Sequence, residues 1–227
     1  MFLFFLSYAY ELSGETDEAI DAVREAQKLN DLPRLNYQEA WIFYHARQWD
    51  TALKLFNEVV EKYKNRRDEQ SLKLVQDAMF RISNIYVEQG DIKRGVEVLE
   101  AVLERDPDNI QANNDLGYLW ADQNENLERA KEMIEIALAA EPDNPAYQDS
   151  MGWVLYRMEK YEEAHTYLDK AVKHENGEDS TLYDHLGDCL QKLNRQSEAQ
   201  AIWKKALKLE EEKSAPSEKL LKSLKEK

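Results

Sequence analysis

The chain has 227 residues, 33% charged and 43% hydrophobic, and its 45 acidic against 30 basic residues give a formal charge of −15. This charge argues against the backbone of a nucleic acid or an anionic membrane as the main ligand, and it favours a basic or neutral partner. The acidic residues could also serve only to solvate the outer helices. Cys189 is the only cysteine, so no disulfide can form within the chain, and its place beside Leu190 predicts a small buried residue.

The first 12 residues are rich in apolar side chains, but they are too few to cross a membrane and lack the basic leader and cleavage motif of a signal peptide. We expect them to form the first helix of a hairpin, which turns at residues 11–14 into a second helix over Asp17–Leu29. This helix lacks the polar outer face of a native terminal repeat. We therefore expect earlier repeats, or a second copy of the chain related by a two-fold axis, to cover its apolar residues Phe2, Leu3, Phe4, Phe5 and Leu6.

The second predicted hairpin pairs a helix over Tyr37–Arg47 with a helix over Asp50–Tyr63. Residues 64–70 then contain no apolar side chain, but Leu72 and its apolar neighbours follow at once without Gly or Pro. We therefore expect helix to continue through these residues and to lengthen the helix pair, rather than a flexible loop.

Three further hairpins are predicted between residue 76 and about residue 176. Their junctions at residues 105–109 and 141–145 place a proline before Asp or Asn caps, and Pro145 suits the first position of a helix. A sixth hairpin is expected over Ser180–Glu211, and the segment Glu218–Lys227 carries leucines on one side with lysines around them. We interpret this segment as a capping helix, although a basic amphipathic helix can also bind a membrane surface.

A repeat underlies these hairpins. Gly117, Gly152 and Gly187 each follow a large apolar residue at intervals of 35 residues, and Ala130, Ala164 and Ala199 accompany them at corresponding positions. Weaker copies extend back to the N-terminus, which gives the approximate repeats 1–33, 34–66, 76–109, 110–144, 145–179 and 180–213, with a capping helix over 216–227. Small residues at this period are what paired helices need in order to approach closely.

These residues resemble the tetratricopeptide repeat, whose signature combines a large residue, Leu-Gly, a Tyr, two Ala residues and a closing Pro. The resemblance implies an all-α fold, a right-handed superhelical solenoid of about six helical hairpins, as a single domain over residues 1–227. The two units around Gly117 and Gly152 look like those of a bacterial group of such proteins, some of which are envelope lipoproteins that act as adaptors. Because no lipidation cysteine accompanies them, the compartment stays open between cytoplasm and periplasm.

The residues expected for catalysis or for metal binding are missing from the pattern. The four histidines form no two-histidine helical motif, and the sequence has no Gly-rich phosphate loop and no Gly-x-Ser-x-Gly turn. We predict no catalytic residue, no cofactor, no metal and no enzymatic activity.

In proteins of the family that the chain resembles, the first helix of each hairpin lines a concave groove. The corresponding positions here are Tyr37, Trp41, Tyr44, His45, Phe80, Asn84, Asn114, Tyr118, Asp149, Trp153, Tyr156, Arg157, Asp184 and Asp188. This aromatic and acidic set differs from the Lys, Asn and Arg clamp of members that bind a carboxylate terminus, and it favours a basic or neutral segment with apolar anchors. Each ring could instead only pack between neighbouring helices. The leading hypothesis is thus a non-catalytic protein-binding scaffold, and the alternative is a self-assembly module that forms a homodimer through the apolar N-terminal helix.

Overall fold

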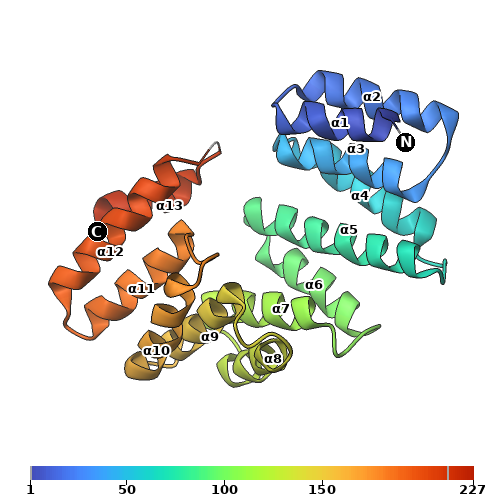
Figure 1. Cartoon of the computed structure of the whole chain (residues 1–227). Coiled ribbons are helices and arrows are strands. Elements are labelled where there is room, and N and C mark those ends of the chain that lie inside the picture. Colours follow the sequence, from blue (N-terminus) through green and yellow to red (C-terminus); the bar gives the residue numbers. More distant parts are fainter. Residues whose placement is uncertain (1, 214) are drawn as a thin grey trace. The chain divides into compact units, whose positions relative to one another are not determined.

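The computed structural model describes residues 2–213 and 215–227 (Figure 1), and these residues form helices without any strand. The all-α prediction is therefore confirmed. The helices are α1 (Phe2–Leu12), α2 (Thr16–Leu29), α3 (Pro33–His45), α4 (Trp49–Tyr63), α5 (Glu69–Glu88), α6 (Ile92–Leu103), α7 (Ile110–Asp122), α8 (Leu127–Ala140), α9 (Pro145–Arg157), α10 (Tyr161–Lys173), α11 (Ser180–Lys192), α12 (Gln196–Glu211) and α13 (Glu218–Glu226).

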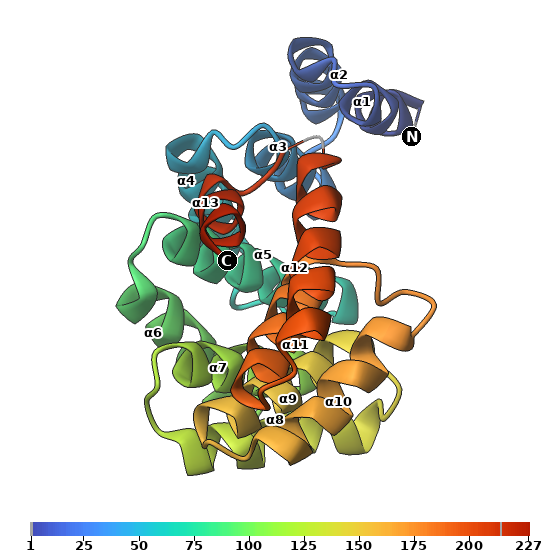
Figure 2. The same ribbon diagram turned by 90° about the vertical axis from the view of Figure 1, so that its left-hand side faces the viewer.

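Contacts between the helices divide the chain into two compact units, Met1–Arg105 and Asp106–Lys227. Unit 1 holds the helix pairs α1/α2, α3/α4 and α5/α6, and unit 2 holds α7/α8, α9/α10 and α11/α12, with α13 packed against α12 (Figure 2). The pairs follow the six predicted hairpins in order. The single continuous domain stays a prediction.

Helix starts follow the polar residues that the sequence analysis interprets as caps. The side chain of Asn109 accepts a hydrogen bond from the Ala112 backbone N–H at 2.9 Å, and that of Asn144 accepts one from the Ala146 N–H at 3.0 Å. Pro145 occupies the first turn of α9, as predicted. These side chains satisfy backbone donors that the first turn of a helix leaves without a partner.

The prediction of continuous helix through residues 64–70 was wrong. Helix α4 ends at Tyr63, and α5 begins at Glu69 because the carboxylate of Asp68 caps the Ser71 N–H at 2.9 Å. The extra residues of this repeat nevertheless lengthen a helix, as expected, since α5 spans 20 residues. Helix α3 likewise begins four residues earlier than predicted, with Pro33 in its first turn.

The recurring glycines lie where two helices of a pair touch. A Cβ atom at Gly152 would lie 2.5 Å from Leu168 Cγ, and one at Gly187 would lie 2.3 Å from Trp203 Nε1. At Gly117 the carbonyl oxygen of Ala130 would be only 2.9 Å away. The glycines therefore permit the close packing of α7, α9 and α11 on their partner helices.

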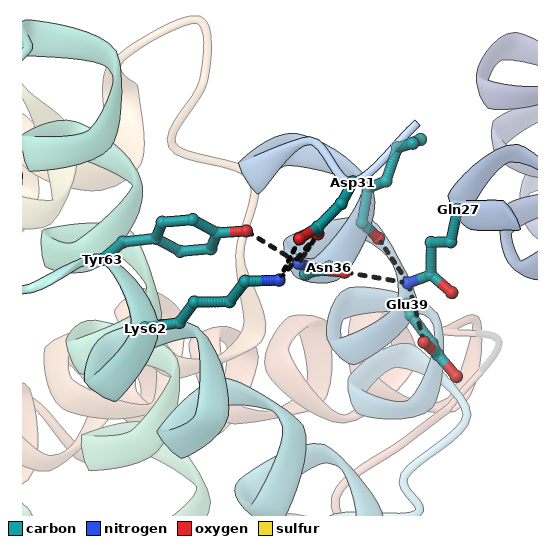
Figure 3. A network of polar contacts seen from close by, with 7 residues as sticks. Gln27, Asp31, Asn36, Glu39, Lys62 and Tyr63 are labelled. Carbon is teal, nitrogen blue, oxygen red and sulfur yellow. Dashed lines mark hydrogen bonds and ion pairs between the residues drawn. The ribbon is translucent and has the colours of Figure 1, made fainter. Parts of the chain in front are cut away.

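A polar network joins the first two hairpins of unit 1 (Figure 3). The side chain of Asn36 donates to Asp31 Oδ1 at 3.1 Å and to the Tyr63 hydroxyl at 2.8 Å, and Lys62 Nζ lies 2.6 Å from the same Asp31 carboxylate. The Gln27 amide donates to Glu39 at 2.9 Å. The network fixes the junction between α2 and α3 beside the end of α4.

Candidate functional site: the inner faces of the two units

On unit 1, the predicted groove residues of α3 divide into two groups. Tyr37 and Tyr44 pack against Phe56 of α4, with ring centroids 5.4 and 6.2 Å apart, and so contribute to the hairpin's own packing. Burial raises the pKa of the Tyr37 hydroxyl, although the nearby Arg81 guanidinium opposes the shift. The Arg81 guanidinium also lies 5.4 Å over the Tyr44 ring. These two tyrosines therefore hold α3, α4 and α5 together.

Trp41 and His45 contact α1 instead. Their rings lie 3.8 Å apart, Tyr8 stacks on Trp41 at 5.8 Å, and His45 Nδ1 lies 2.8 Å from Glu11 Oε1. Tyr8 and His45 are exposed, so this ring cluster reaches the surface. Tyr8 was not among the predicted groove residues. It lies 33 residues before Trp41, which is the spacing of the first two repeats, so placing the groove positions on the first repeat as well would have identified it.

The other groove residues predicted for unit 1 lie on α5. Phe80 is buried with 6% of its surface exposed, and Asn84 is half-buried. Neither makes a ring contact with Trp41 or His45 in the described part of the chain.

On unit 2, three rings form a stack that crosses from α9 to α11. Trp153 lies between Tyr156, at 4.9 Å and 7° between ring planes, and His185, at 4.0 Å and 14°. The Arg157 guanidinium lies 5.7 Å over Trp153, and Tyr118 of α7 approaches His185 at 6.1 Å. The structure thus brings together four predicted residues, Tyr118, Trp153, Tyr156 and Arg157. The ring that joins α7 and α9 to α11 is His185, which was considered from the sequence only as a possible metal ligand.

His185 forms a buried pair with Asp149. The carboxylate oxygens of Asp149 lie 2.9 and 3.0 Å from His185 Nδ1. Burial opposes the charged imidazole, but the carboxylates of Asp149, Asp184 and Asp188 together outweigh this effect, so the pKa of His185 is raised. Burial together with the Asp188 carboxylate raises the pKa of Tyr156 to about 12. The carboxylate of Asp149, a predicted groove residue, is therefore already paired with His185 of α11.

The two other predicted carboxylates, Asp184 and Asp188, are engaged by Lys227, which follows α13. Lys227 Nζ lies 2.6 Å from Asp184 Oδ1 and also contacts Asp188 Oδ1. Burial raises the pKa of the Asp184 carboxyl even though Lys227 opposes the shift. The acidic side of this face is thus neutralised in part by the chain itself.

Three buried side-chain atoms on α7 and α9 have no hydrogen-bond partner among the described residues: Gln148 Oε1, Asn114 Oδ1 and Trp153 Nε1. Asn114 and Trp153 are the two that belong to the predicted groove residues, and they are only 6% and 7% exposed. A buried donor or acceptor without a partner costs about 1–3 kcal/mol. Most native buried polar groups avoid this cost. Atoms of the same kind also occur in unit 1, for example Gln38 Nε2 and Ser71 Oγ, so Asn114 and Trp153 differ from these only in lying on the face of the ring stack.

The N-terminal residues predicted for self-association also divide. Leu3 and Phe4 pack into the core of unit 1, and Leu6 is half-buried. Phe2 and Phe5 are 76% and 59% exposed. Leu12, which lies on the same side of α1, is 68% exposed. Of the five residues predicted for self-association, only Phe2 and Phe5 therefore belong to the exposed apolar surface of α1.

The described residues contain no group of three or more His, Cys, Asp or Glu side chains that could hold a metal ion. Within the same residues, none of the helices combines the length and the apolar character needed to span a membrane.

The chain is similar to known repeats along most of its length. Family models described as "Tetratricopeptide repeat" match residues 2–31, 36–66, 86–154, 146–173 and 180–213. These ranges cover most of five of the six predicted repeats and the second helix of the third, and the match over residues 86–154 runs across the junctions at residues 105–109 and 141–145. A search of curated proteins finds no match.

Solved structures show the same fold. A tetratricopeptide repeat protein from Parabacteroides merdae superposes with a TM-score of 0.70 at 15% identity, over 98% of this chain and 82% of that one. A thermophilic TPR protein of Thermus thermophilus gives 0.65 at 17% identity, over 86% and 98% of the two chains. A MamA fragment from Desulfovibrio magneticus gives 0.58 at 19% identity, over 81% and 97%.

Proposed function

Because the chain belongs to the tetratricopeptide repeat family, whose members bind protein partners, we propose that it is a non-catalytic scaffold that holds a partner segment against the inner face of unit 2. This face is formed by α7, α9 and α11 and carries Tyr118, Asn114 and the ring stack of Tyr156, Trp153 and His185. The observation that carries the proposal is the pair of buried polar atoms, Asn114 Oδ1 and Trp153 Nε1, without hydrogen-bond partners among the described residues.

An extended peptide backbone offers what the two atoms lack. Its carbonyl group accepts a hydrogen bond, as the Trp153 indole N–H requires, and its amide N–H donates one, as the Asn114 amide oxygen requires. Half-buried Tyr118 and Tyr156 would supply apolar contact area next to these groups. Trp153 itself is 7% exposed, so it would contribute its N–H group and its packing rather than area.

The experiment selects binding peptides from a random displayed library on the full chain, and then compares their affinity for two variants. Trp153→Phe keeps a six-membered aromatic ring at this position but removes the N–H donor together with the five-membered ring that carries it, and the loss of ring area is matched in the control below. One neutral hydrogen bond contributes about 1 kcal/mol, so affinity should fall about fivefold. Trp120→Phe, a ring replacement elsewhere in unit 2, is the matched control and should leave affinity unchanged. Equal affinity of the Trp153→Phe variant and the wild-type chain for every selected peptide would refute the proposal.

The second candidate function is self-association through α1. It is supported by the exposure of Phe2, Phe5 and Leu12, which lie on one side of that helix and have no charged residue among them. Burying one large apolar side chain contributes about 1.5–3 kcal/mol, so two copies would gain from covering this surface. Light scattering at micromolar concentration should report a dimer, and Phe2→Ser with Phe5→Ser should convert it to a monomer. A monomeric wild-type chain under the same conditions would exclude this function.

A further inference from the structure

One lysine side chain of the molecule is seated in a site built by two other helices. Lys227 Nζ lies 2.6 Å from Asp184 Oδ1, contacts Asp188 Oδ1, and sits 5.3 Å over the ring of Trp203. The Trp203 indole N–H donates to Asp188 Oδ1 at 3.1 Å and so fixes that carboxylate. We call Asp184, Asp188 and Trp203 the ammonium seat.

The seat has the chemistry of a lysine site. Two carboxylates four residues apart on α11 converge on one point, which suits the compact charge of an ammonium group better than the planar fork of a guanidinium group. The Trp203 ring adds the attraction of an aromatic face for a cation. The Asp184 and Asp188 side chains are 12% and 21% exposed, so the site is shielded from water but reachable.

Helix α13, which precedes Lys227, is held by different contacts at its start and at its end. At its start, the buried Glu210 carboxylate accepts hydrogen bonds from the Ser217 backbone N–H and the Ser180 hydroxyl, and it pairs with Lys213 Nζ at 2.8 Å. Beyond this anchor, Leu224 is the one buried residue of α13. The far end of α13 is therefore held by Leu224, by the exposed pair of Lys225 with Glu211, and by the seat itself.

The seat adjoins the face that is proposed to bind a partner. Asp184 directly precedes His185 on α11, and His185 stacks on Trp153 of that face. A segment lying along α7, α9 and α11 would therefore pass next to the two carboxylates.

From this geometry we infer that the ammonium seat binds a lysine side chain of the partner segment, and that Lys227 occupies the seat in competition with it. The inference rests on the proposed function and names what the partner must carry. When a partner lysine enters, the far end of α13 moves away while the Glu210 anchor keeps its start in place.

The seat can be tested without the partner, by titrating the full chain with Nα-acetyl-lysine amide. The readout is the indole N–H signal of Trp203 in nuclear magnetic resonance spectra, assigned with a Trp203→Phe variant. In Lys227→Gln the seat lacks its own lysine, so the probe should bind with a millimolar dissociation constant. The wild-type chain should bind about tenfold more weakly, because a tethered competitor acts at a high effective concentration. Nα-acetyl-norleucine amide, which has the stem without the charge, should not bind.

Lys225→Gln is the matched control, because Lys225 lies on the same helix but its ammonium group is 3.9 Å from Glu211 and outside the seat. It should bind the probe as weakly as the wild-type chain. Adding Asp184→Asn and Asp188→Asn to Lys227→Gln should abolish binding. If Lys227→Gln lowers the helix content, Lys227→Met, which keeps the apolar stem over Trp203, replaces it.

Three results would overturn the inference: no probe binding to either Lys227 variant, equal binding to Lys227→Gln and Lys225→Gln, or binding that survives loss of both carboxylates. None of these concerns the proposed function, because the probe has only one residue and does not reach the ring stack. Conversely, failure of the Trp153→Phe test with a working seat would refute the proposed function and leave a lysine site of unassigned use.

Discussion

Replacing Asp149 by Asn should destabilise unit 2, and the loss should be larger at acidic than at alkaline pH. The carboxylate lies 2.9 Å from the buried Nδ1 of His185 and raises the pKa of that imidazole. Removing one partner of a buried ion pair costs about 3–5 kcal/mol, because the remaining charge stays buried without compensation. Asn has nearly the same shape, so the change removes charge rather than volume.

The sign follows from proton binding. A raised folded-state pKa means that the pair's contribution is fully present below the unfolded histidine value of about 6.5 and is lost as pH rises through the folded value. In the Asn variant, the imidazole of the folded chain must either stay charged and unpaired or give up its proton at acidic pH. At alkaline pH it is neutral in both states, and only about one hydrogen bond, roughly 1 kcal/mol, is at stake.

Besides Asp149 and the stacked Trp153 ring, three groups face His185 and set the background for this measurement. Asp184 and Asp188 on the same helix favour the charged imidazole, although Lys227 engages both of them, and the Tyr118 ring lies 6.1 Å away. These groups are the same in both chains, so they cancel when the variant is compared with the wild type.

Thermal unfolding followed by circular dichroism at about pH 5 and about pH 9 measures the effect. The matched control is Asp143→Asn, which breaks the exposed pair with Lys170 and should cost less than about 1 kcal/mol at either pH. If Asp149→Asn lowered the melting temperature equally at both pH values, the carboxylate would not be holding a charged imidazole.

Two further changes test the packing and the caps. Gly187→Ala places a Cβ atom 2.3 Å from Trp203 Nε1 and should cost about 1–3 kcal/mol by overpacking, measured as a lower melting temperature, whereas Ala139→Ser on the exposed side of α8 should have almost no effect. Asp68→Ala removes the cap of α5 and should cost about 1 kcal/mol, with faster amide hydrogen exchange at Ser71; unchanged exchange there would mean that the cap does not hold the start of the helix.

Much of the fold follows from local pattern because a repeat restates the same rule several times. The glycines predict where helices touch, and Pro or Asx residues predict where they start. The error at residues 64–70 shows the limit of this reasoning. A polar run with good helix propensity reads as helix, and only the hydrogen bond from the Ser71 N–H to Asp68 shows that a new helix begins there.

The candidate site was predicted less completely, because periodicity assigns a residue to a face but not to a neighbour. Trp153 lies on the expected side of α9, yet it is buried because His185 from α11 stacks over it. Lys227 was interpreted only as part of a capping helix held by leucines. Its contacts with Asp184 and Asp188 join residues about 40 positions apart in the chain, which no local pattern can indicate.

The contacts of these carboxylates also change what the net charge of −15 implies. The formal charge favours a basic partner, but on the inner face of unit 2 the acidic residues are already engaged: Asp149 by His185, and Asp184 and Asp188 by Lys227. A basic segment would therefore gain little from general attraction at this face, since its charge would first have to replace an existing contact. Such an exchange favours a ligand that places a lysine at the ammonium seat over a ligand that only carries positive charge. The internal pairs therefore make binding at this face depend on where the lysine lies in the ligand rather than on the ligand's net charge.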